Sequence, residues 1–550
     1  MNNKKLADLI FPNAKPISHY KEKYPRRNLE EGAIVTRFAP SPTGFVHIGS
    51  LYQALISNKM AKQTNGVFFL RIEDTDQKRE IEEGVSEIIN SLNNFGISFD
   101  EGMIDDNNEK GEYGPYKQSS RKEIYQSYAK SLIEKGLAYP CFLTLEELEE
   151  MRKKQESLKI RPGCYGIWAK YRNLPPEQAI EKIKNGENYI IRLKSMGNEN
   201  RKIRHHDLIK GNVDFPENDQ DIIIIKSDGL PTYHFAHAVD DHLMGTNLVI
   251  RGDEWLSSMP IHIELFKILE FKQPKYAHIS PIMKDDNGAK RKISKRKDPE
   301  AAVSYYHEEG IPNEAVKEYL LNIANSSFEN WRRANKEKNI EEFKLELNKM
   351  NVSGAVFDMV KLLDISKNVI SKYTAEDVYK EVLEWAKKYD NELQKILENN
   401  PEYAKKVFNI ERGNIKPRKD IAKWSDIQEN IFYMYEDLYN PNKEDYEYQK
   451  INNMEDIREI LQKYITKYYN PEDNKQQWFD KIKDLSEELG YAREVKEYKK
   501  SPDAYKGHVG DISTVLRVSL TSKSNTPDLY EIMQVLGKET VEKRIKRIIQ

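Results

Sequence analysis

Residues 37–50 combine residue types that can bind the phosphate groups of a nucleotide. They read Arg-Phe-Ala-Pro-Ser-Pro-Thr-Gly-Phe-Val-His-Ile-Gly-Ser, where an apolar strand pattern gives way to a helical one. Backbone N–H groups at a helix N-terminus attract anions, and Gly49 allows a nucleotide to approach the backbone closely. The ring of His47 can donate to phosphate oxygens on which negative charge develops. Because an isolated His-x-Gly more often only caps or packs a helix, these two residues alone leave a structural role open.

Residues 290–297, Lys-Arg-Lys-Ile-Ser-Lys-Arg-Lys, form a second constellation. Such a run of like charge is usually a solvated surface or a non-specific polyanion patch. Transfer of an adenylyl group, however, expels pyrophosphate, and mobile lysines that close over the β- and γ-phosphates would neutralise this leaving group. Lys292 and Lys295, with Ser294 between them, are therefore candidates for phosphate binding.

An acidic cluster ends a predicted strand in residues 69–76, Phe-Leu-Arg-Ile-Glu-Asp-Thr-Asp. Doubly wound folds bind ligands at the carboxyl ends of their strands, so a carboxylate here can contact a substrate. Thr75 and Asp76 are also good helix N-caps. We assign capping to one of these two residues and the substrate to Glu73.

These candidates need elements that bring them together, and the hydrophobic pattern predicts a βαβα start. Residues 33–38 and 67–72 are apolar and rich in β-branched or aromatic side chains, whereas residues 48–63 and 81–92 repeat apolar side chains at helical spacing. Alternation of this kind favours a parallel, doubly wound sheet.

The alternation stops after Gly111 and returns with strands at 247–250 and 276–279 around a helix at 260–269. The sequence therefore predicts a nucleotide-type α/β fold that is split by an inserted domain. From about residue 300 onward the pattern is almost entirely amphipathic helix. Prolines interrupt residues 1–32, in which we expect an appendage without regular elements.

Composition limits the class of protein. The chain has 550 residues and a mass of 64.4 kDa, too long for one core at about 150 residues per domain. Its 87 basic and 89 acidic residues give a formal charge of −2, so no global basic field indicates a nucleic-acid partner. Only two cysteines, Cys141 and Cys164, exclude a disulfide scaffold and a Cys-rich zinc ribbon. Without a long apolar run or an export signal, we expect a soluble, multidomain, cytoplasmic protein.

The first constellation resembles the ATP-site motif of glutamyl-tRNA synthetases, a class I aminoacyl-tRNA synthetase family. Ser50 stands where the family's His-Ile-Gly-His motif has its second histidine. Residues 292–296, Lys-Ile-Ser-Lys-Arg, resemble the family's Lys-Met-Ser-Lys-Ser motif and lie C-terminal to the first motif, as a class I site needs. The resemblance implies a split Rossmann-like catalytic domain of α/β type with an inserted α+β acceptor-binding domain. An all-α, anticodon-binding half would follow it.

The resemblance also implies roles for individual residues, and it makes His47, Lys292 and Lys295 catalytic. It places ATP among His47, Gly49, Glu254, Ile282, Met283, Lys292, Ser294 and Lys295. It places glutamate among Arg37, Ala39, Ser41, Glu73, Tyr233, His237 and Arg251. Glu73 would hold the α-ammonium group, and Arg37 and Arg251 are the candidates for the two carboxylates, which match an arginine fork. His237 stands where the family often has asparagine, and its charge could vary near neutral pH.

By the same resemblance the chain divides into six segments. They are an N-terminal extension (1–32), a first Rossmann half (33–111), an inserted acceptor-stem domain (112–220), a second Rossmann half with the basic loop (221–300), a stem-contact helical region (301–370) and anticodon-binding helices (371–550). For tRNA binding we single out Asp240 near its acceptor end, and Arg418 with Trp424, a base-stacking aromatic, in the helical half. A solvated helix surface is an equally good interpretation of the last two.

The implied activity is ATP-dependent ligation of L-glutamate to the 3′ end of tRNA(Glu) through glutamyl-adenylate, with release of AMP and pyrophosphate. We expect ATP with Mg²⁺, no metal held by protein side chains, no membrane partner and a monomer. No zinc is expected, because a structural zinc needs four ligands and Cys141 and Cys164 stand alone.

Three alternatives share parts of this pattern. A glutaminyl-tRNA synthetase would have Pro-Glu-Pro-Asn where residues 40–43 read Pro-Ser-Pro-Thr, and β-barrels in place of the helical half. A truncated paralogue that glutamylates a modified tRNA base would lack residues 300–550. A catalytically silent tRNA-binding regulator would be expected to lose His47, Lys292 or Lys295. Whether tRNA(Gln) is charged as well depends on how the helical half treats one anticodon base.

Overall fold

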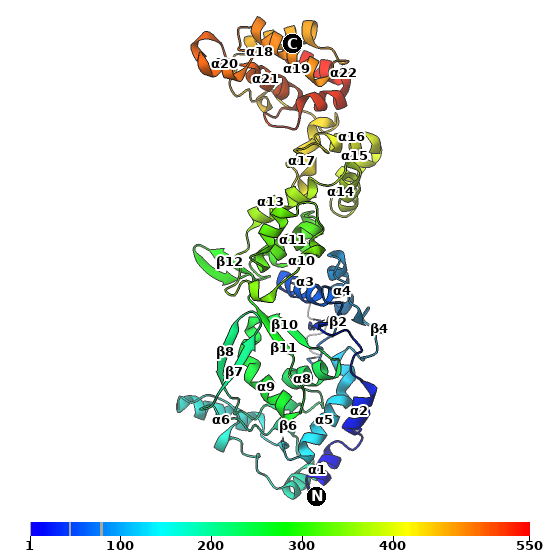
Figure 1. Ribbon diagram of the computed structural model, residues 1–550, viewed down its shortest axis with the longest axis vertical. Helices are drawn as coiled ribbons and strands as arrows, with labels where there is room; N and C mark the ends of the chain where they lie inside the picture. Colours follow the sequence, from blue (N-terminus) through cyan, green and yellow to red (C-terminus); the bar gives the residue numbers. More distant parts are fainter. Residues whose placement is uncertain (1, 43–45, 77–80) are drawn as a thin grey trace. The chain divides into compact units, whose positions relative to one another are not determined.

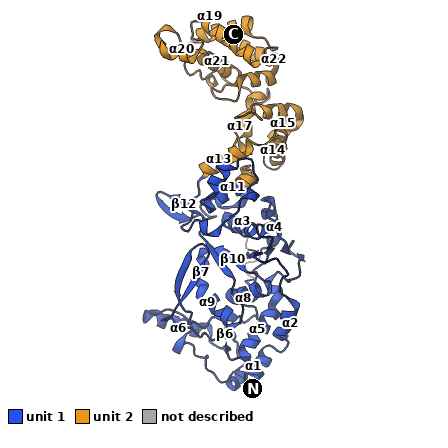
Figure 2. Cartoon of the chain, viewed as in Figure 1, with its two compact units in different colours: residues 1–305, 317–358 blue, residues 306–316, 359–550 orange. Residues whose placement is uncertain are grey.

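The computed structural model describes residues 2–42, 46–76 and 81–550 (Figure 1). The chain forms two compact units, residues 1–305 with 317–358, and residues 306–316 with 359–550 (Figure 2). Within the described ranges, no helix is long and apolar enough to cross a membrane.

The first sheet confirms the predicted βαβα start. It contains β1 (Val35–Phe38), β2 (Val67–Leu70), β3 (Glu101–Met103) and β4 (Glu109–Lys110) in this order, and β1, β2 and β3 are parallel. Helix α3 (Ile48–Lys62) connects β1 to β2, and α4 (Gly84–Asn94) lies between β2 and β3 in the chain. All four residues of β1 are buried, as expected of a parallel strand that is covered on both faces.

The second sheet supplies the other half of the split fold. Its order is β10-β11-β7-β8, with β10 (Leu248–Gly252) parallel to β11 (Lys275–Ile279). Helices α8 (Tyr233–Leu243) and α9 (Met259–Ile268) come before and after β10 in the chain. The Asn247 side chain accepts from the Val35 N–H group at 2.8 Å, and the Asn247 N–H group donates to the Val35 carbonyl at 3.2 Å. The two halves therefore lie side by side.

The inserted region has its own antiparallel sheet of β5 (Ala138–Cys141), β6 (Ile190–Leu193) and β9 (Ile223–Ile225). Its helices are α5 (Lys122–Glu134), α6 (Leu145–Ser157) and α7 (Pro176–Lys184).

The division expected after residue 220 cuts across this architecture. Strand β9 belongs to the inserted sheet, whereas the hairpin of β7 (Lys202–Asp207) and β8 (Gly211–Pro216) extends the second sheet through pairing of Asp207 with Tyr276. Sequence order does not show which sheet edge a hairpin extends.

Residues 2–27 differ from the irregular appendage that the prolines predicted. They form α1 (Asn2–Ile10) and α2 (Ile17–Lys23), which pack against α5. Leu6, Ala7 and Tyr20 are buried in this contact region. The prediction was wrong because two helices of seven to nine residues leave too few repeats for a period to be recognised.

A two-stranded hairpin carries the basic run. Its strands β12 (Met283–Asp286) and β13 (Ala289–Lys292) are antiparallel. Asn287 and Gly288 connect them with φ of 56° and 87°, the paired positive values of a tight hairpin turn. The chain then continues through α10 (Val303–Glu308), α11 (Asn313–Ala324) and α12 (Phe328–Ala334).

Residues 359–550 are helical, as predicted. The helices are α13 (Met359–Ile370), α14 (Ala375–Tyr389), α15 (Asn391–Asn399), α16 (Pro401–Asn409), α17 (Ile427–Ile431), α18 (Met454–Lys463), α19 (Lys475–Glu488), α20 (Val495–Lys500), α21 (Val509–Thr521) and α22 (Leu529–Ile549). They enclose two apolar cores, one around Val382 and Phe408 and the other around Ile482 and Leu516. Gly537 interrupts α22 with φ of 79°, a conformation that favours glycine.

Candidate active site

His47 lies at the N-terminus of α3, where the first constellation was expected to bind phosphate. Its Nδ1 atom accepts a hydrogen bond from the Gly49 N–H group at 2.9 Å. A Cβ atom at Gly49 would lie 3.1 Å from Nδ1, so glycine keeps this helix start open. The backbone of His47 also pairs with that of Ala302 in an antiparallel β-bridge. Residues 43–45 of the same motif lie outside the described residues.

The first constellation, residues 37–50, and the second, residues 290–297, lie close together in one compact unit. Burial lowers the pKa of His47, and the positive charges of Lys295 and Lys292 lower this pKa further. The imidazole is therefore neutral at pH 7. The structure thus brings the predicted catalytic residues together at the start of α3.

The loop after β13 is tied down by Asp298. This carboxylate accepts two hydrogen bonds from Arg291 at 2.7 and 2.8 Å and one from the Ser294 N–H group at 2.9 Å. The Lys292 and Lys295 side chains remain exposed. Lys292 Nζ lies 3.9 Å from Glu254 Oε1, so two residues that were predicted to contact ATP are neighbours.

The backbone at Ile282 and Met283 is already hydrogen-bonded. The Ile282 carbonyl accepts from the Ile293 N–H group at 3.1 Å. The Met283 N–H group donates to the Ala355 carbonyl at 2.9 Å, and its own carbonyl accepts from Phe357 at 2.7 Å. The predicted contact of Met283 with adenine is therefore limited to the second lone pair of its carbonyl.

A buried ion-pair cluster joins the ends of β1 and β2 to α8. Arg71 donates to Asp241 Oδ1 at 2.6 Å and to Glu73 Oε1 at 3.1 Å, and Arg37 Nε lies 3.4 Å from both oxygens of Asp241. Burial raises the pKa of Asp241, but Arg37 and Arg71 outweigh it and hold this pKa well below its usual range. Burial raises the pKa of Glu73 against the same two arginines. The Asp241 carboxylate therefore stays ionised between Arg37 and Arg71.

The other predicted glutamate ligands of the first constellation lie beside Glu73. Ala39 is half-buried and Ser41 is exposed. The Glu73 N–H group donates to the carbonyl of Pro40, between them, at 2.9 Å. The segments that follow β1 and β2 thus run together at this edge of the sheet.

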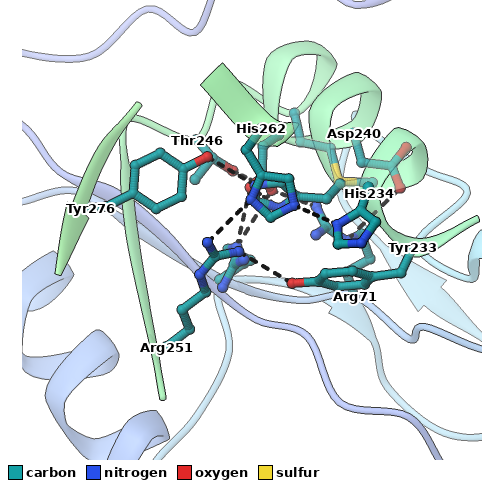
Figure 3. A network of polar contacts seen from close by, with 12 residues as sticks. Arg71, Tyr233, His234, Asp240, Thr246, Arg251, His262 and Tyr276 are labelled. Carbon is teal, nitrogen blue, oxygen red and sulfur yellow. Dashed lines mark hydrogen bonds and ion pairs between the residues drawn. The ribbon is translucent and has the colours of Figure 1, made fainter. Parts of the chain in front are cut away.

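Arg251 is 3% exposed and lies among aromatic rings (Figure 3). It donates to Tyr233 Oη at 3.3 Å, to His278 Nε2 at 3.0 Å and to His262 Nδ1 at 3.1 Å. None of these partners is charged negatively, and among the described residues Arg251 forms no ion pair. A buried cation without a counter-ion favours an anionic ligand.

The hydrogen bonds define the tautomers of two histidines. An arginine can only donate, so His278 Nε2 accepts and Nδ1 carries the proton, which it donates to Asp207 Oδ2 over an N···O distance of 2.6 Å. In the same way His262 donates through Nε2 to His234 Nδ1 at 2.9 Å. Burial lowers the pKa of His262 well below its usual range, which keeps it an acceptor for Arg251.

Sequence reasoning missed Arg71, Asp207, Asp241, His262 and His278 as parts of this site. Arg71 and His278 stand at the carboxyl ends of parallel strands, which is a usable signal. His262 lies on α9 and Asp207 on β7, and only the folded chain brings them to Arg251 and His278.

His237 corrects one expectation. It is fully buried, its Nε2 atom lies 2.9 Å from Tyr276 Oη, and its Nδ1 atom lies 3.0 Å from Asp241 Oδ2. Burial lowers the pKa of His237 to about 4. The expected variation of its charge near neutral pH is therefore wrong.

The three residues singled out for tRNA are inaccessible. Asp240 is fully buried and accepts from Arg121 at 2.7 Å, Gln118 at 2.9 Å and Tyr125 at 2.7 Å. Arg418 is 9% exposed and holds Asp420 with both arms of its guanidinium. Trp424 is 3% exposed and packs on Gly310. All three predictions are corrected, because side chains with internal partners cannot grip RNA without unfolding their surroundings.

Across the described part of the chain, no group of three or more His, Cys, Asp and Glu side chains is arranged to hold a metal ion. Cys141 and Cys164 are both buried, and the Cys164 thiol donates to the Trp168 carbonyl at 3.8 Å. The absence of zinc stays a prediction.

Comparisons with known proteins agree with this architecture. Residues 33–364 match the family model described as tRNA synthetases class I (E and Q), catalytic domain, and residues 377–549 match the anticodon binding domain. A glutamate–tRNA ligase of Clostridium perfringens (strain SM101 / Type A) is 53% identical and one of Clostridium beijerinckii is 51% identical, each over the full length of both chains.

A solved structure supports the same assignment. It is a glutamate tRNA ligase from Elizabethkingia meningosepticum in complex with its amino acid, with a TM-score of 0.73 and 26% identity over 94% of this chain and 99% of that one. The predicted α/β catalytic part and the all-α, anticodon-binding part are confirmed. The chain therefore belongs to the class I tRNA synthetases (E and Q), within the group of glutamate–tRNA ligases.

Proposed function

We propose that this protein ligates L-glutamate to the 3′ end of tRNA(Glu) through glutamyl-adenylate, with release of AMP and pyrophosphate. The observation that supports glutamate most directly is Arg251, a buried guanidinium with no carboxylate partner among the described residues. The side-chain carboxylate of glutamate would neutralise this charge, whereas the amide of glutamine would not.

Glutamate has further partners in the same cluster. Tyr233 Oη lies 3.3 Å from the Arg251 guanidinium and can donate to the same carboxylate. Glu73 can hold the α-ammonium group, and Arg37, which shares Asp241 with Arg71, can contact the α-carboxylate. Ala39 and Ser41, beside Glu73, and His237 complete the proposed pocket.

ATP would bind where the two basic constellations meet. His47 and Gly49 at the start of α3, Glu254, the Ile282–Met283 backbone, and Lys292, Ser294 and Lys295 would contact it. A carboxylate oxygen of glutamate attacks the α-phosphorus, the bond to the bridging oxygen breaks, and pyrophosphate leaves with that electron pair. Lys292 and Lys295 would offset the negative charge that develops on the leaving group, and the neutral ring of His47 would donate a hydrogen bond to a phosphate oxygen.

Mg²⁺ would accompany ATP through phosphate oxygens and water, since no side-chain cluster is arranged for a metal in the described ranges. In the second step the terminal ribose hydroxyl of tRNA attacks the acyl carbon and AMP leaves. The inserted sheet β5-β6-β9 with its helices would hold the acceptor end, residues 301–370 would contact the stem, and residues 371–550 would read the anticodon. We propose a cytoplasmic monomer.

The test is charging of purified tRNA(Glu) and tRNA(Gln), each with radiolabelled glutamate and, as a matched control, radiolabelled glutamine. Glutamate charging of tRNA(Glu) with pyrophosphate release is expected. Charging with glutamine at a comparable kcat/KM would contradict the proposal, and charging of tRNA(Gln) with glutamate would extend it to a second tRNA.

A further inference from the structure

The N-terminal segment, here residues 2–27, lies outside the catalytic family match, which begins at residue 33. It is nevertheless a built part of its unit. Helix α1 packs against α5 and α7. Helix α2 packs against α5 (Figure 1). Lys130 of α5 donates to the Phe11 carbonyl at 3.1 Å and pairs with Asp8 at 2.7 Å. Residues 2–27 therefore run along the inserted region and lead toward the two sheets of the catalytic part.

Arg27 ends this path between the two halves of the split fold. Its guanidinium donates twice to Glu101 of β3, at 2.7 and 2.8 Å, and its Nε atom donates to the Met244 carbonyl after α8 at 2.8 Å. The Arg27 side chain is 8% exposed, and its guanidinium carbon lies 3.9 Å from the centre of the Tyr113 ring. One side chain thus links the first sheet to the helix that carries Tyr233 and Asp241.

Neighbouring contacts hold residues 113–116, the segment on which the Arg27 guanidinium packs. Tyr24 Oη donates to the Gly114 carbonyl at 2.8 Å, and Tyr113 Oη donates to the Pro25 carbonyl at 2.9 Å. Glu101 also accepts from Tyr116 Oη at 2.8 Å. Residues 113–116 are therefore held by Tyr24, Pro25 and Arg27 together.

Residues 116–119 form hydrogen bonds with the residues that follow β2, where Glu73 lies. The Ile72 N–H group donates to the Tyr116 carbonyl at 2.9 Å, and the Gln118 N–H group donates to the Ile72 carbonyl at 3.0 Å. The Ser119 N–H group donates to Asp74 at 2.8 Å. Both chain neighbours of Glu73 are thus bonded to residues 116–119, Ile72 through its backbone and Asp74 through its side-chain carboxylate.

We propose that Arg27 is a positioning residue for the amino-acid site: it holds Glu101, residues 113–116 and the end of α8 so that Glu73 and Asp241 keep their places. The inference rests on the proposed function of Glu73. It predicts a selective effect, because the hydrogen-bond partners of Arg27 are Glu101 and Met244. His47, at the N-cap of α3, and Lys292 and Lys295, at the end of β13 and in the loop after it, lie on other elements.

The experiment measures the KM for glutamate and for ATP in tRNA charging by full-length wild type, R27A, R27K, E101Q and the double variant R27A/E101Q. The exposed neighbour Arg26 supplies the matched control, R26A. We expect R27A to raise the glutamate KM about 5- to 30-fold with the ATP KM within about two-fold of wild type. R27K, which keeps one charge but not the fork, should lie in between. The double variant should resemble R27A, because the two residues act as one unit.

An unchanged glutamate KM in R27A, or an equal rise in both KM values, would overturn the inference, since the second result describes general loosening. If R27A does not fold, R27K decides by the same two criteria. A wild type that charges no tRNA with glutamate would overturn the proposed function together with this inference. An active wild type with an indifferent R27A would overturn the inference alone.

Discussion

The backbone of His47 pairs with that of Ala302 in an antiparallel β-bridge, although the two residues lie far apart in the sequence of the catalytic unit. The Val303 N–H group also donates to the Val46 carbonyl at 3.1 Å, so the start of α3 lies against the segment that follows the loop with Lys292 and Lys295. The strand–helix motif and the basic loop are thereby neighbours in one compact unit. The sequence analysis expects these motifs to share one phosphate site, and that role stays a prediction.

Replacing Lys295 by alanine should slow adenylate formation about 100- to 1,000-fold, the usual loss of one charge-stabilising donor. Glutamate affinity should stay nearly unchanged, because Lys295 lies in the phosphate loop and not among Arg37, Glu73 and Arg251. Rapid-quench measurement of pyrophosphate release, with tRNA present, checks the rate. K290A, on the exposed edge of the same hairpin, is the control. Equal losses in rate and glutamate affinity would count against a leaving-group role.

Replacing Arg251 by glutamine should raise the glutamate KM at least about 100-fold, because the ligand carboxylate would enter a buried site without its cation. R251K should recover little, since an ammonium group cannot hold His262, His278 and Tyr233 at once. Steady-state charging at varied glutamate gives the KM values. R204A removes an exposed arginine that pairs with Asp214 and should leave them unchanged.

The buried histidines predict acid sensitivity. Burial lowers the pKa of His234, His237 and His242 to about 4 each, below the value of about 6.5 in an unfolded chain. The unfolded state therefore binds more protons between these values, and stability that is present above pH 6.5 is lost as the pH falls toward 4. The Tm of H237N should fall less than that of wild type between pH 6.5 and 4.5. The control H206N changes an exposed histidine, and a slope like that of H237N in this control would refute the assignment.

Trp424 should matter for stability and not for tRNA contact. W424A should lower the free energy of unfolding of the helical unit by about 3–5 kcal/mol, the cost of removing a buried aromatic side chain. Denaturant titration measures this change, and filter binding of tRNA to the folded fraction should match wild type. Y505A removes a tyrosine that is 36% exposed and should change stability far less. Weaker tRNA binding by fully folded W424A would restore the stacking role.

Dialysis against a zinc chelator should leave the Tm and the charging rate unchanged. The reason is that the chain has only two cysteines, both buried, and that no group of metal-binding side chains is found among the described residues. Differential scanning fluorimetry before and after dialysis, together with elemental analysis, provides the measurement. A stoichiometric metal that leaves with a drop in Tm would contradict the expectation.

Local patterns were enough to predict β1 and β2 of the first sheet and the helix start at His47, because each depends on residues that are close in sequence. They did not predict β3 and β4, and they predicted a loop where β12 and β13 form a hairpin. The partners of Arg251 were not predictable in this way. His262, His278 and Asp207 acquire their roles only through burial against a residue on another strand. The tRNA-binding roles predicted for Arg418 and Trp424 were wrong for the same reason. The sequence does not show that Arg418 pairs with Asp420 or that Trp424 packs on Gly310.

The hydrogen bonds of the Arg27 guanidinium set the order in which parts of the chain can fold during its synthesis. Glu101 and the Met244 carbonyl, which anchor it, leave the ribosome long after Arg27 itself. Helices α1 and α2 therefore emerge before α5, against which both of them pack. In this protein an early-made segment gains its last contacts late, so we expect its apolar side chains to stay uncovered during synthesis until α5 has followed and to be fixed by Arg27 only after residue 244.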